Sequence, residues 1–138
     1  MKSKVLAVGA VVGGLLLGSG RVFAHHSNAV YDTQHPVTLT GTVTEFGFFN
    51  PHAIVHFQVK DDRGNVEEWV ASTAPPNVLH RSGWTRNTIK PGDQVTLSVN
   101  VARNGRKEAH IVKIAVNGKV LRGAEGDDGG GQYQSGAR

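Results

Sequence analysis

The chain has 138 residues, with 15 basic and 11 acidic side chains, seven histidines and no cysteine. The length suits one compact domain and leaves little room for a second. The absence of cysteine excludes a disulfide framework and any zinc site of the cysteine type.

The first 24 residues have the pattern of a secretory signal peptide. Two lysines precede an apolar stretch over residues 5–17, and the Val-x-Ala sequence that ends at Ala24 fits the small-residue cleavage rule. The stretch is Gly-rich and shorter than the roughly 20 apolar residues of a membrane span. We therefore expect cleavage, no stable membrane insertion, and export to the periplasm or the medium.

Cleavage after Ala24 would also change what the charge implies. It removes two lysines and one arginine, so the formal charge falls from +4 to +1. A nearly neutral chain carries little electrostatic signal for nucleic acid, and we expect no such partner. Met1 is the sole methionine, so any transition-metal site would use nitrogen and oxygen ligands, which suit Cu(II), Zn or Ni better than Cu(I).

The remaining chain alternates apolar and polar residues in short runs separated by turn residues, which is the pattern of a β-protein. An arm over residues 25–36 comes first, and a Gly-rich tail over residues 123–138 is expected to be disordered. Lys90-Pro91-Gly92-Asp93 has the residues of a type II turn. One short helix is expected over residues 77–82. The expected strands lie near residues 37–44, 53–59, 66–72, 95–101 and 112–116, with a short sixth piece that ends at Leu121.

Three strands, a short helix and two further strands form the element order of an OB-fold barrel. We therefore predict a mainly all-β domain over residues 37–122, an OB-like five-stranded barrel with one short helix; a β-sandwich is the alternative. The usual ligand surface of an OB-fold combines strands two and three with two loops. Here those loops contain residues 48–52 and 103–107.

Several short motifs resemble one family of small exported bacterial proteins of unknown function. They are His25-His26-Ser27 after the signal peptide, Asn50-Pro51-His52, and Gly83-Trp84-Thr85 ahead of the type II turn, and the similarity spans about residues 24–122. The resemblance implies export and a single small β-domain. It carries over no established activity and no catalytic residues.

Cleavage after Ala24 would create a metal-ligand arrangement at the new amino terminus. His25 would offer its α-amine and ring Nδ1 as a chelating pair, and His26 would add a second imidazole. Cu(II) stands highest among the divalent first-row metals for such ligands. The arrangement resembles the amino-terminal histidine copper sites of other exported proteins. The alternative interpretation is that both histidines merely follow the cleavage site in an arm.

His52 and His56 are the barrel histidines that could complete such a site. On a straight strand their Cα atoms would lie about 13 Å apart, so we expect one of them, rather than both, to reach the arm. His52 is preferred because it lies at the edge of a loop; the alternative is a strand-starting residue hydrogen-bonded to a turn. The other three histidines, His35, His80 and His110, are interpreted as surface or structural residues.

A second set of residues would serve a different ligand on the usual OB-fold surface. His56, Trp69 and Arg106 are its candidates; packing for Trp69 and a solvated turn for Arg106 are the alternatives. The serines lack a nucleophile-elbow context, so we predict a protein that is not an enzyme. The leading hypothesis is an exported protein that binds a divalent metal such as Cu(II). The alternative is a barrel for a periplasmic protein or small ligand, in which the histidines are incidental.

Overall fold

The computed structural model describes residues 30–124 of the protein, and its regular structure is mainly strands. Within this range the order of strands and helix agrees with the order expected from the sequence. The elements are β1 (Val37–Gly47), β2 (Ile54–Lys60), β3 (Val66–Ser72), α3 (Pro76–Arg81), β4 (Gln94–Val101), β5 (Glu108–Val116) and β6 (Lys119–Leu121).

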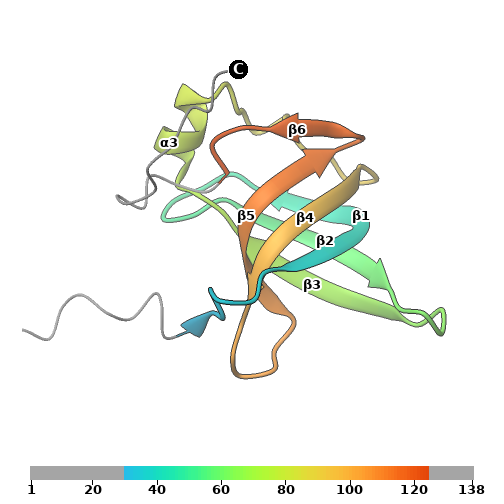
Figure 1. Cartoon of the computed structure of the whole chain (residues 1–138). Helices are drawn as coiled ribbons and strands as arrows, with labels where there is room; N and C mark the ends of the chain where they lie inside the picture. The colour runs from blue at the N-terminus through green and yellow to red at the C-terminus, as the bar shows by residue number, and fades with distance from the viewer. Residues whose placement is uncertain (1–29, 125–138) are drawn as a thin grey trace, which may run out of the picture.

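The strands form a barrel in which the long strand β1 pairs with both β2 and β4 (Figure 1). Residues 37–42 of β1 pair with β4, and residues 42–47 pair with β2. A β-bulge between Val43 and Glu45 bends the strand between these two pairings. β2 pairs with β3 and β4 with β5, while parallel pairing of β3 with β5 closes the barrel. The OB-like five-stranded barrel with one short helix is therefore confirmed.

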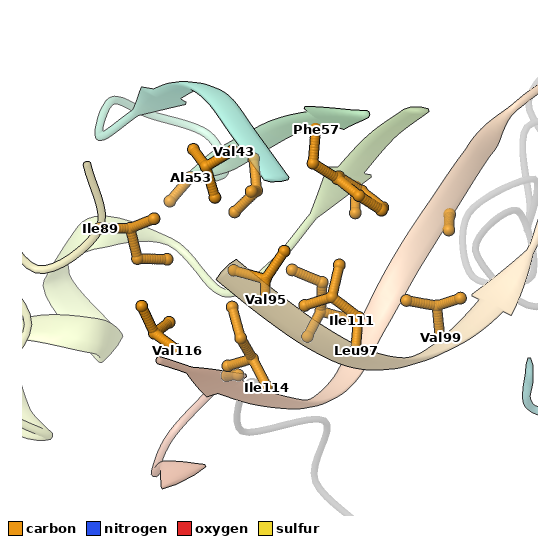
Figure 2. Packing of buried hydrophobic residues seen from close by; sticks show 14 of the residues in the cluster. Val43, Ala53, Phe57, Ile89, Val95, Leu97, Val99, Ile111, Ile114 and Val116 are labelled. Carbon is orange, nitrogen blue, oxygen red and sulfur yellow. The ribbon is translucent and has the colours of Figure 1, made fainter. Parts of the chain in front are cut away.

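The period-two pattern of the strands places one face of each in the core. Val95, Leu97 and Val99 of β4 are fully buried, as are Val55 and Phe57 of β2. Figure 2 shows Phe57 and the three β4 side chains meeting labelled side chains of β1 and β5 inside the barrel. Burial of each side chain of this size stabilises the folded state by about 1.5–3 kcal/mol. The outward-facing positions of β2, β3 and β5 remain available for other contacts.

The alternation expected for β5 is interrupted by a second bulge. Val112, Ile114 and Val116 were expected to share a face, but Val112 is only half-buried and Ile111 is fully buried. The register of β4 against β5 shifts between Ser98 and Val99. Because a one-residue shift turns every following side chain to the other face, the core uses Ile111 before the bulge and Ile114 after it.

The turns and the helix begin and end where special backbone residues require it. Gly92 has φ +90°, and the Asp93 N–H donates to the Lys90 carbonyl at 3.1 Å, as in a type II turn. α3 begins at Pro76, ends before Gly83, and buries Leu79 in the core. In Figure 1 the β2–β3 and β4–β5 turns project away from α3.

The structure bears on only part of the remaining sequence predictions. The predicted signal peptide, residues 25–29 and residues 125–138 lie outside the described range. Ala124, which falls in the predicted tail, is 2% exposed and packs against the core. Between residues 30 and 124, no helix is both long and apolar enough to cross a membrane.

Candidate functional site

The last residues of the amino-terminal arm are hydrogen-bonded to the barrel at the end of β4. Tyr31 forms an isolated bridge with Ala102. The Asp32 N–H donates to the Val101 carbonyl at 2.9 Å, and the Arg103 N–H donates to the Val30 carbonyl at 2.9 Å. Backbone hydrogen bonds therefore fix the position from which the arm continues toward His26 and His25.

Asp32 adds side-chain contacts that hold the arm in this position. Its carboxylate lies 3.0 Å from the His35 ring and 3.7 Å from the Arg103 guanidinium, and it accepts the Gln34 N–H at 3.1 Å. The hydrogen bond with His35, followed by that from Gln34, lowers the pKa of Asp32. Because the group is exposed, these contacts are worth little individually, and together they define one conformation.

Tyr31 places its ring against the outer face of the barrel. The Tyr31 and His110 ring centroids are 6.0 Å apart, and His110 Nδ1 lies 3.3 Å from the Ser72 hydroxyl. Ser72 pairs with His110 on one side and with Ile54 on the other. The arm thus reaches the face of β3 and β5 that continues to β2. The strand spacing of His110 alone did not predict this contact.

His52 lies just before β2, two residues ahead of Ile54, the β2 partner of Ser72. Its Nδ1 is 3.1 Å from the carbonyl oxygen of Thr73, and its side chain is exposed. Because a carbonyl can only accept, Nδ1 carries the proton and neutral His52 keeps its lone pair on Nε2. Ala53 holds this loop to the end of β3, since its carbonyl accepts the Thr73 N–H at 2.9 Å. His52 is therefore both hydrogen-bonded to a turn and available through Nε2.

His56 lies in β2, paired with Glu45 of β1 and Val70 of β3, and is half-buried. The structure does not bring it to His52. Among residues 30–124, no three histidine or acidic side chains gather in a way that could hold a metal ion. A metal site built on His52 would therefore need ligands from beyond this range. His25 and His26, the predicted ligands, lie outside the described residues.

Trp69 is packed among its neighbours and Arg106 lies in a solvent-exposed turn, as their alternative interpretations describe. Trp69 is 7% exposed; its indole N–H donates to Glu67 at 3.2 Å, and the Lys107 ammonium lies 5.2 Å from its ring centroid. Arg106 is exposed and lies 3.4 Å from Glu108. Packing and a neighbouring lysine thus cover most of the Trp69 ring, which leaves little of it for a ligand to stack on.

The basic loop over residues 103–107 is partly neutralised by neighbouring acids. Lys107 pairs with Glu67 at 3.0 Å, and the hydrogen bond from Lys107 is the largest cause of the lowered pKa of Glu67. Arg103 and Arg106 each have an acidic partner as well. This loop is therefore a weaker site for a polyanion than its sequence indicates.

Two residues of the site, Tyr31 and Thr73, were missed by the sequence reasoning. Tyr31 is the only aromatic residue of the arm over residues 25–36, and that isolation was a usable signal for a docking residue. Thr73 is fully buried; its carbonyl accepts from His52 and its hydroxyl donates to the Ala124 carbonyl at 2.5 Å. No sequence pattern marks a threonine for such a role.

Fold and site together define a small OB-like barrel with a docked amino-terminal arm and an exposed histidine beside it. The chain belongs to a family of unknown function, DUF6152, whose profile matches residues 14–111. That range includes the His25-His26-Ser27 and Asn50-Pro51-His52 motifs. The predicted membership of an uncharacterised family is confirmed. A search of curated proteins found no match, so the function has to be argued from the residues themselves.

Proposed function

We propose that this protein is exported to the periplasm and binds a divalent metal ion, most favourably Cu(II), at its processed amino terminus. His25 supplies its α-amine and ring Nδ1, His26 a second imidazole, and His52 a ligand from the barrel. The observation that carries the barrel part of this proposal is the hydrogen bond from His52 Nδ1 to the Thr73 carbonyl.

That hydrogen bond prepares His52 for coordination in the way common among metal-bound histidines. Such residues donate one ring N–H to a carbonyl or carboxylate, which fixes the tautomer and orients the other nitrogen toward the metal. Thr73 is fully buried, so its carbonyl is a fixed acceptor. Neutral imidazole with its lone pair on Nε2 is the form that binds Cu(II).

The docked arm supports the proposal because the chain is long enough to bring the histidines to His52. From His110, beneath Tyr31, the distance to His52 is two strand spacings across and two residues along, about 12 Å on the barrel surface. His26 is separated from Tyr31 by four residues, and this segment can span about 17 Å when extended. The covalent length therefore suffices for a shared site.

The ligand set defines the chemistry that the site can perform. Amine and imidazole nitrogens hold Cu(II), whereas the mature chain would contain no thiolate or thioether to favour Cu(I). Binding or carrying Cu(II) is therefore the proposed role, without a redox step. Both ligand types must lose protons to bind, so affinity falls on acidification.

The proposal is tested by titrating the correctly processed protein with Cu(II) and following the nitrogen couplings in its electron paramagnetic resonance spectrum. Acetylation of the His25 α-amine should weaken binding at least about tenfold, because it removes the amine from the chelate. His52→Gln should weaken binding by about the same factor and remove one nitrogen coupling. His80→Gln, at an exposed position of α3, is the matched control. Affinity that survives acetylation would refute the amino-terminal site.

A further inference from the structure

A polar groove lies between the connection from α3 to β4 and the β5–β6 hairpin. Its volume is about 780 Å³, within the range of small-molecule sites. Residues 82–93 form one wall and residues 116–122 form the other. In Figure 1 this region, with α3 and β6, is well separated from the arm and the β4–β5 turn. No histidine lines the groove, so it shares no ligand with the proposed copper site.

Three cationic side chains, from both walls, line this groove. Lys90 comes from the type II turn, Lys119 from β6 and Arg122 from the residue after β6. None of them lies within ion-pair distance of a carboxylate in residues 30–124, where the ion pairs involve other cations. The buried residues Trp84 and Val116 and the amide of Asn117 also line the groove.

The single acidic residue of the groove, Asp93, is held by other groups. Its carboxylate accepts the Asn117 side-chain amide at 3.0 Å and the Lys90 backbone N–H at 2.8 Å. The hydrogen bond from Asn117 is the largest cause of the lowered pKa of Asp93. Asp93 thus joins the type II turn to the β5–β6 hairpin, and the lining keeps an excess of positive charge.

The backbone that carries these cations is fixed before any ligand arrives. The Trp84 indole N–H donates to the Arg122 carbonyl at 2.7 Å, and Trp84 is 2% exposed. Lys119 is paired with Val116 in the β5–β6 ladder, and the Asp93 contacts hold Lys90. A ligand would therefore order three side chains rather than a loop, which lowers the cost of binding.

We propose that this groove binds a small organic anion through Lys90, Lys119 and Arg122. The anion carries carboxylate or phosphate groups, for which Arg122 can form paired charge-assisted hydrogen bonds. Its uncharged part faces Asn117 and the neighbouring hydroxyl and amide groups. This site uses no histidine, so it stands or falls independently of the copper proposal.

The test is a nuclear magnetic resonance titration of the processed protein with citrate, glucose 6-phosphate and, as the uncharged probe, methyl glucoside. At least one anion should give saturable shifts in the amides of residues 82–93 and 116–122, while methyl glucoside gives none. The anion that binds identifies the preferred charged group. Lys119→Gln and Arg122→Gln should each weaken binding about tenfold, because each removes a charge-assisted contact. Lys113→Gln, an exposed lysine of β5 outside the groove, is the matched control.

Three outcomes would overturn the proposal. The first is the absence of saturable shifts with both anions up to about 10 mM, which would correspond to no useful affinity. The second is an equal loss of binding in Lys113→Gln, which would indicate nonspecific attraction. The third is binding that Lys119→Gln and Arg122→Gln leave unchanged, which would show that these cations do not hold the anion.

Discussion

Replacement of Thr73 by valine tests the hydrogen bond that fixes the end of the described chain to the barrel. Thr73 directly follows β3 and is fully buried, and its hydroxyl donates to the Ala124 carbonyl. Valine has nearly the same shape and opens no large cavity. The substitution therefore removes one donor and leaves the carbonyl of Ala124, a residue that is 2% exposed, without it.

The expected cost follows from that unsatisfied acceptor. Leaving one buried polar group unpaired costs about 1–3 kcal/mol, and we expect the lower half of this range because Ala124 lies near the edge of the described chain. A loss of about 1–2 kcal/mol would lower Tm by about 4–12 °C in a domain of this size. The matched variant, Thr38→Val at an exposed position of β1, should stay within about 0.5 kcal/mol of the wild type.

The assay is urea unfolding followed by tryptophan fluorescence, with the midpoint compared at constant m value. A Thr73→Val midpoint shift no larger than that of Thr38→Val would refute the assigned hydrogen bond. The same variant separates stability from metal binding. Because His52 bonds to the backbone carbonyl of Thr73 rather than its side chain, the Cu(II) affinity of Thr73→Val should remain that of the wild type.

Two other predictions concern β1 and the arm. In Gly41→Ala a Cβ would lie 2.3 Å from the Gln58 carbonyl oxygen, so we expect at least about 1–3 kcal/mol of destabilisation in urea; a change below about 0.5 kcal/mol would contradict this packing. The pKa of Asp32 is lowered, first by its hydrogen bond with His35. Ionised Asp32 therefore stabilises the folded protein at any pH above the ordinary carboxyl pKa. That stability is lost as pH falls through the lowered value, below about pH 4. In Asp32→Asn the urea unfolding midpoint should therefore fall less steeply at acid pH than in the wild type. Identical pH profiles of the two proteins would rule out this contribution.

Much of the fold could be predicted from the sequence because local patterns determine it. Alternation of apolar residues located the strands, with β3 expected and observed over residues 66–72. Proline before α3 and glycine after it located the helix. The five-strand order then left an OB-like barrel as the favoured topology. Ile111 was missed because a bulge, which depends on the facing strand, changes which β5 residues face the core.

The candidate site was harder to predict because its contacts join distant segments through backbone atoms. His52 was identified as a candidate from its loop position, but its bond to Thr73 depends on how β2 meets β3. The position of His110 depends on the parallel pairing of β3 with β5 that closes the barrel. Ala124 was assigned to a tail from composition alone, which carries no information about a single buried hydrogen bond.

The central claim is that export and cleavage after Ala24 create a Cu(II) site. It is tested most directly by the intact mass of the exported protein, measured under native conditions with and without Cu(II). We predict the mass of a chain that begins at His25, and an increase by the mass of one copper ion per chain when Cu(II) is added. The mass of a chain that begins at another residue would contradict this claim. A chain that begins at His25 and takes up no copper would also contradict it.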